Sequence, residues 1–82
     1  DATATFVVNS FLNYMQNLCT AYDLGLVSPR SFQVIHAGRV VWWYRVLSPY
    51  ITDRRVTYHN ADIWRVFEER ARQEERHFPL AA

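Results

Sequence analysis

The residues of this chain that could do chemistry are few, and their spacing does not suit catalysis or metal binding. The available soft metal ligands are His36, His59, His77 and Cys19, and none lies at the i,i+4 or Cys-x2-Cys spacing of metal sites. No nucleophile turn accompanies the serines, and two glycines are too few for a phosphate-binding loop. We therefore expect no enzymatic activity, no metal ion and no cofactor.

Arginines and aromatic rings offer the best means of recognition. Arg54 and Arg55 lie close to Tyr58 and His59 in the sequence, and such a mixture of cations and rings is typical of sites for RNA or single-stranded nucleic acid. Eight acidic residues offset nine basic ones, however, and the formal net charge is only +1. Because a chain this close to neutral has no long-range field to attract a polyanion, nucleic-acid binding is the alternative function and not the first one.

Association with protein is the function that the aromatic residues favour. Tryptophan, tyrosine and arginine are enriched at interface hot spots, and all three are abundant here. Trp42 and Trp43 would point about 100° apart on a helix, so one small core can hardly enclose both. We expect a non-enzymatic interaction or assembly module, such as a subunit of a viral or organellar complex, that binds another chain or a second copy of itself. The expected partner-binding residues are Phe32, Trp42, Trp43, Tyr44, Arg45 and Trp64.

The size and cysteine content limit the class of protein. With 82 residues the chain suits a single domain spanning 1–82, and it is too short for two. Its one cysteine excludes an intrachain disulfide and favours an intracellular location. No uncharged run is long enough to span a membrane. Because the chain begins with Asp1, we expect it to be a fragment or a processed piece of a longer protein.

Apolar periodicity predicts a small all-α domain of three helices, over about 5–22, 29–47 and 60–77. The first has a polar side that is rich in amides and free of charge, comprising Asn9, Asn13, Gln16 and Asn17, and Gly25 suits a left-handed stop after it. Ser28 and Pro29 are a strong helix start, and Ser48 and Pro49 are expected to end that helix.

The remaining segments are less regular. Residues 48–59 are expected to form an irregular connector, Asn60 to cap the third helix, and 78–82 to form a short apolar tail. Residues 39–47 are rich in β-branched and aromatic side chains, so an α+β fold with a strand there is the alternative. Between 32 and 47, 11 of 16 residues are apolar, and a helix so apolar on most sides must be covered by its own domain or by a partner.

Overall fold

The computed structural model describes residues 1–78, and these form helices and turns without any strand. The long helices are α1 (Ala2–Asp23), α3 (Ala37–Thr57) and α4 (Arg65–Glu74). Three short segments complete the chain: α2 (Pro29–Ser31), the π-helical turn η1 (Phe32–His36) and the 3-10 turn η2 (Glu75–His77). The all-α prediction is confirmed, and the alternative strand over 39–47 is wrong because these residues belong to α3, where packing outweighs their β propensity. Residues 79–82 of the expected tail lie outside the described part.

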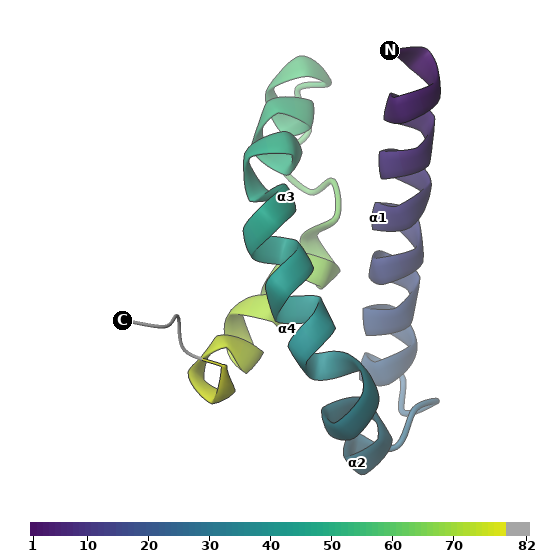
Figure 1. Cartoon of the computed structure of the whole chain (residues 1–82), viewed down its shortest axis with the longest axis vertical. Helices are drawn as coiled ribbons and strands as arrows, with labels where there is room; N and C mark the ends of the chain where they lie inside the picture. Colours follow the sequence, from purple (N-terminus) through teal and green to yellow (C-terminus); the bar gives the residue numbers. More distant parts are fainter. Residues whose placement is uncertain (79–82) are drawn as a thin grey trace.

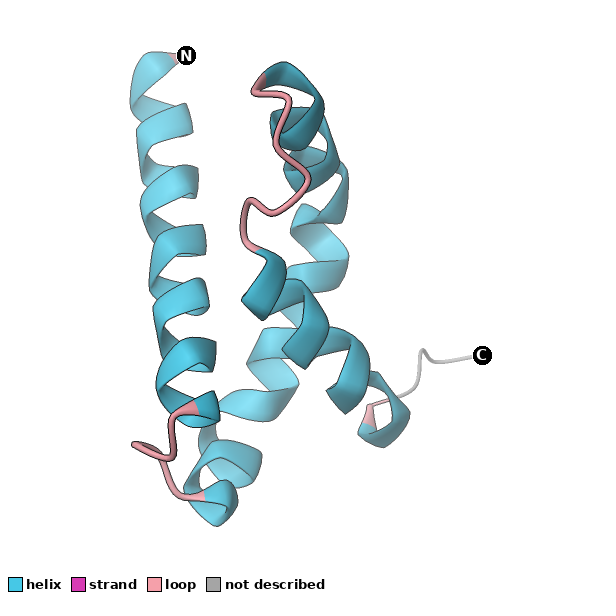
Figure 2. Cartoon of the chain, turned by 180° about the vertical axis from the view of Figure 1, so that it is seen from behind, coloured by secondary structure: helices cyan, strands magenta, loops and turns pink. Residues whose placement is uncertain are grey.

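Helices α1 and α3 run side by side in opposite directions, and α4 packs on both of them from one side (Figures 1 and 2). In Figure 1 α4 begins beside α1 and passes behind α3, and in Figure 2 it lies in front of α3. The core between the three helices contains Leu12, Met15 and Cys19 of α1, together with Val40, Tyr44, Ile51, Trp64, Phe67 and Ala71. The fold is therefore a two-layer arrangement in which α4 covers only one face of the α1–α3 pair.

The expected end of α1 and start of α2 are confirmed. After α1 the backbone amides of Gly25 and Leu26 donate to the carbonyls of Tyr22 and Ala21, at 3.0 and 2.9 Å. This is the Schellman pattern, which requires the left-handed φ of 79° that Gly25 adopts. The hydroxyl of Ser28 then accepts the amide of Ser31 at 3.0 Å, so it caps the next helix with Pro29 in the first position.

The expected break at Ser48 and Pro49 is wrong, since α3 continues through Pro49 to Thr57 and the connector over 48–59 is mostly helix. A proline inside a helix costs about 3 kcal/mol, because a backbone hydrogen bond is lost and the ring crowds the preceding turn. Contacts beyond Pro49 offset this cost: Ile51 is buried in the core, and Tyr50 donates its hydroxyl to Asn9 at 2.7 Å. Tertiary contacts therefore decide where this helix ends.

One π-helical turn lies between α2 and α3. The amide of Ala37 donates to the carbonyl of Phe32, five residues earlier, which places one extra residue in this turn. Phe32 is thereby brought onto the side of Ala37 and Val40, and all three side chains are fully buried. A regular helix through this region would put Phe32 above His36 instead, away from the core.

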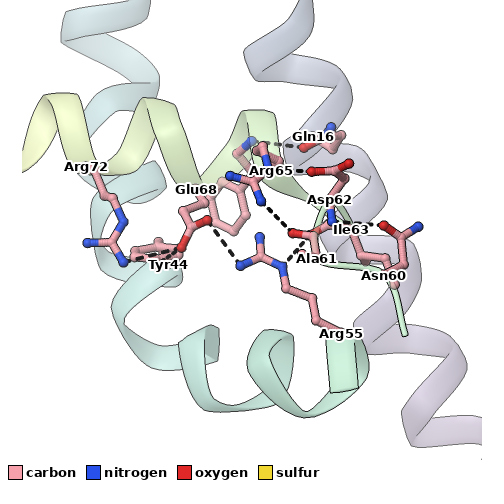
Figure 3. Close-up of polar contacts among 11 residues, drawn as sticks. Gln16, Tyr44, Arg55, Asn60, Ala61, Asp62, Ile63, Arg65, Glu68 and Arg72 are labelled. Carbon is pink, nitrogen blue, oxygen red and sulfur yellow. Dashed lines mark hydrogen bonds and ion pairs between the residues drawn. The ribbon is translucent and has the colours of Figure 1, made fainter. Parts of the chain in front are cut away.

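Helix α4 is shorter than expected, because residues 61–64 form turns and the helix begins at Arg65. Asn60 does not cap it; its side-chain oxygen accepts the amide of Asp62 at 2.9 Å in a local turn. The first turn of α4 is capped by another helix, since Gln16 of α1 accepts the amide of Phe67 at 2.9 Å (Figure 3).

The amides of α1 hold the start of α4 and the end of α3 in place. Asn9 accepts the hydroxyl of Tyr50, Asn13 accepts the indole N–H of Trp64 at 2.8 Å, and Gln16 accepts the amide of Phe67. The three residues, which we call the amide ladder, lie on one side of α1 at helical spacing. The uncharged polar side seen in the sequence is therefore a tertiary contact surface.

Gln16→Ala is expected to lower the free energy of unfolding by about 1–2 kcal/mol, because the first turn of α4 loses its only side-chain cap within the described residues. Urea denaturation measures the change. Asn17→Ala, which removes an exposed amide from the same helix, is the control and should stay within about 0.5 kcal/mol of the wild type. Equal losses in the two variants would contradict the capping role of Gln16.

Candidate functional site

Half of the residues expected to bind a partner lie inside this chain's own core. Phe32 is fully buried against the ring of Tyr22, with 4.2 Å between ring centroids. Tyr44 is buried and donates its hydroxyl to Glu68 at 2.7 Å. Trp64 is buried as well, stacked on Tyr50 and hydrogen-bonded to Asn13. Phe32 thus packs on α1, Tyr44 joins α3 to α4, and Trp64 contacts both α1 and α3, so all three rings belong to the core of this chain.

The other three expected residues lie nearer to the surface. Arg45 is half-buried and donates to the backbone carbonyl of Phe78, whose ring lies against Gly38. Trp43 is half-buried and meets the ring of Phe11 edge-on, with 4.8 Å between the ring centroids. Trp42 is 56% exposed. Its ring meets the ring of Trp43 edge-on, with 4.7 Å between the ring centroids. Of the six residues, Trp42 and Trp43 are therefore the ones placed to meet a partner.

An apolar groove runs between α1 and α3 beside these two tryptophans. It consists of two adjoining cavities that share Phe11 and Trp43. One, of about 270 Å³, has an apolar lining, and the lining of the other, of about 290 Å³, includes His36 and Arg39. The first is lined by Val7, Val8, Phe11, Trp43 and Leu47, and the second by Phe11, Tyr14, Met15, Leu18, His36, Arg39 and Trp43. We call these residues together the α1–α3 groove.

The groove lies on the side of α1 that faces away from α4. Val7, Phe11 and Tyr14 each precede a member of the amide ladder by two residues, and two residues on a helix are separated by about 200°. The amides hold α4 on one side, so the apolar side chains project from the other. Val7 and Tyr14 are 58% and 57% exposed, and Phe11 between them is half-buried against Trp43.

Among the residues that line the groove, Arg39 alone has a formal charge. Helix α1 has no charged side chain between Ala2 and Tyr22, so one wall is neutral along its whole length. His36 and Arg39 line the end of the second cavity, and Arg39 is exposed without an ion pair or side-chain hydrogen bond among residues 1–78. The groove is therefore suited to an apolar occupant with an acidic group near Arg39.

The residues of the alternative nucleic-acid site are engaged within the chain. Arg54 pairs with Asp53 at 2.8 Å and lies over the rings of Tyr50 and Tyr58. Its hydrogen bond to Asp53 raises the pKa of Arg54. Arg55 pairs with Glu68 at 3.1 Å and donates to the carbonyl of Ile63 at 2.9 Å (Figure 3). Tyr58 and His59 are exposed at the end of α3, so the four residues share a region but both cations already have partners.

Glu68 is the centre of the polar contact between α3 and α4. It accepts the hydroxyl of Tyr44 and pairs with Arg55 and Arg72 (Figure 3). Burial raises its pKa, but the hydrogen bond from Tyr44 and the charge of Arg55 outweigh burial, so the pKa of Glu68 lies below its ordinary value. Burial and the hydrogen bond to Glu68 raise the pKa of Tyr44. These contacts join α3 to α4.

The remaining candidates for chemistry are the thiol of Cys19 and the possible metal ligands. Cys19 is fully buried, and burial raises the pKa of its thiol to about 12, which suppresses the reactive thiolate. Among residues 1–78 no three histidine, cysteine or acidic side chains come together as metal ligands would. No helix in the same part of the chain is both long and apolar enough to cross a membrane.

Comparisons of the chain with protein-family models, with curated proteins and with solved structures find no match in any of the three.

Trp64→Phe is expected to lower the free energy of unfolding by about 1–3 kcal/mol, because it removes the donor to Asn13 and leaves a cavity under α4. Trp42→Phe, on the exposed side of α3, should change it by about 0.5 kcal/mol or less. Urea denaturation of the dilute chain gives both values. A larger loss for Trp42→Phe would show that Trp42 belongs to the core.

Acid should destabilise the chain partly through Glu68. Since the pKa of Glu68 is lowered on folding, its stabilising effect is complete above the ordinary carboxyl pKa and is lost as the pH falls through the folded-state value. Glu68→Gln is expected to reduce stability at neutral pH and to make the decline in acid shallower. The measurement is urea denaturation at a series of pH values. Glu69→Gln, at an exposed position of the same helix, should keep the wild-type slope.

Proposed function

We propose that this chain is a non-enzymatic protein–protein interaction module that binds an apolar helix of its partner in the α1–α3 groove. The observation that carries the proposal is the open apolar face between α1 and α3. Helix α4 packs on the opposite side of this pair, which is the side nearest the viewer in Figure 2. Four-helix arrangements cover such a face with a further helix. Here the described residues supply three long helices, and none of them covers this face.

The dimensions and chemistry of the groove support a helical occupant. From Val7 to Leu18 the wall of α1 is about 16 Å long at 1.5 Å per residue, which is three turns of a docked helix. Hydrophobic contacts would supply most of the binding energy, since Arg39 is the one formally charged residue in the lining. Aromatic side chains near the centre of the contact, here Phe11 and Trp43, are typical of interface hot spots.

The balance of charge favours a protein over a nucleic acid as the partner. A nucleic-acid surface needs several cations that are available to phosphates. In this chain Arg54, Arg55, Arg70 and Arg72 are each paired with a carboxylate of the chain itself. Binding to RNA or to a single strand remains the alternative outcome of the experiment below.

Site-specific photo-cross-linking in the cells that produce the chain tests this function. A diazirine amino acid in place of Val7, which is exposed in the groove, is expected to form a covalent adduct with protein. The same amino acid in place of Glu69, exposed on α4, is the control and should form little or none. Mass spectrometry then identifies the adduct.

A second variant links the adduct to the groove. Leu47→Asp places a charge in the apolar cavity opposite Val7 and should reduce the adduct from position 7 about tenfold, while the circular dichroism of the chain stays helical. Absence of a protein adduct at position 7, or an adduct with nucleic acid in its place, would contradict the proposed function.

A further inference from the structure

The outer side of α3 has a regular stripe of exposed residues that the core does not use. Arg39, Trp42, Val46, Pro49 and Asp53 are all exposed and follow one another at alternating spacings of three and four residues. This is the heptad spacing of a helix that packs lengthwise on another helix. Trp42 and Val46 are 56% and 48% exposed, so the middle of the stripe is an apolar surface beside the groove.

The two ends of the stripe have opposite charges. Arg39 and Asp53 are each seven residues from Val46, on either side of it, and they lie about 21 Å apart along the helix. Arg39 has no ion pair among the described residues. Asp53 pairs with Arg54 through Oδ2 alone, and its Oδ1 has no hydrogen bond from residues 1–78. Both ends are therefore available for a further contact.

We propose that the occupant of the α1–α3 groove is α3 of a second copy of this chain, docked antiparallel and centred on Val46. This inference rests on the proposed function and names its partner. In an antiparallel pair centred on Val46, Arg39 of each copy lies opposite Asp53 of the other, which forms two identical ion pairs. A parallel pair would place Arg39 against Arg39 and Asp53 against Asp53, so the charge pattern selects the antiparallel arrangement.

A two-fold axis through Val46 also makes the groove and the stripe complementary. Because the stripe adjoins the groove, with Arg39 belonging to both and Trp42 next to Trp43 of the groove wall, the stripe of each copy enters the groove of the other, as an isologous interface requires. Trp42 then comes close to Pro49 of the second copy, where a flat ring meets a proline ring. Arg39 lines one end of the groove, and the acidic group that suits this end is Asp53 of the second copy.

Charge reversal tests the pairing on the purified chain. Sedimentation equilibrium across a hundredfold dilution around micromolar concentration is expected to show a monomer–dimer equilibrium for the wild type. Arg39→Asp and Asp53→Arg should each weaken the dimer about tenfold, because two attractions become repulsions. The double variant should restore dimerisation, since the two positions are too far apart to interact within one chain. Arg30→Asp/Glu69→Arg, a reversal at two exposed positions away from the stripe, is the matched control and should have no effect.

Each result decides the inference. Restoration of the dimer by the double variant supports it, provided that circular dichroism shows all variants to be folded. A wild type that stays monomeric throughout, single reversals without effect, or a double variant that is no better than the singles would overturn it. A monomer that forms a cross-link at position 7 with a different protein would overturn the second copy as occupant and leave the proposed function standing. Absence of any protein adduct would contradict both the proposed function and the second copy as occupant.

Discussion

The rest of the structure depends on the three hydrogen bonds that the amide ladder of α1 accepts. Asn9, Asn13 and Gln16 hold Tyr50, Trp64 and the first turn of α4, so they decide on which side of α1 the last helix packs. Each bond contributes about 1 kcal/mol, but leaving Trp64 or Phe67 without an acceptor under α4 would cost more. Because the helical period turns residues two positions apart to opposite sides, the same ladder directs Val7, Phe11 and Tyr14 away from α4. The groove is open because α4 packs on the opposite side of α1.

The charged residues stabilise the fold and leave recognition to apolar surface. Glu68 joins Tyr44, Arg55 and Arg72 across α3 and α4, and the buried Glu74 accepts from Gln33 at 2.8 Å and pairs with Arg70. Arg70 in turn pairs with Asp23 and lies over the ring of Tyr22, which connects α4 to the end of α1. Arginine serves both purposes because its planar group can pair with carboxylates and stack on a ring at once. The face toward the groove, by contrast, is neutral along α1, and Arg39, which has no ion pair among residues 1–78, lies at one end of it.

Two departures from regular helical geometry determine the surface that we propose to be an interface. The π turn at Phe32–His36 brings Phe32 into the core in line with Ala37. The continuation of α3 through Pro49 extends the helix to Asp53 and so puts the acidic end of the stripe on the same element as Arg39. With a break at Pro49 the stripe would end beside Val46, and the charge complementarity between two copies would not arise. Both departures persist because the burial of Phe32 and Ile51 outweighs the local cost.

Periodicity, caps and turn residues were sufficient to predict three helices, the left-handed turn at Gly25 and the start at Ser28, because these depend on neighbours a few residues away. The end of α3, the late start of α4 and the π turn were missed, since each depends on contacts with residues far along the chain. The sequence also singled out the aromatic residues of α3 as unusual, but it could not separate Tyr44, which is buried, from Trp42, which is exposed. Only the packing of α4 against one side of α1 and α3 decides which of the two residues is buried, because a side chain is buried or exposed according to what lies opposite it.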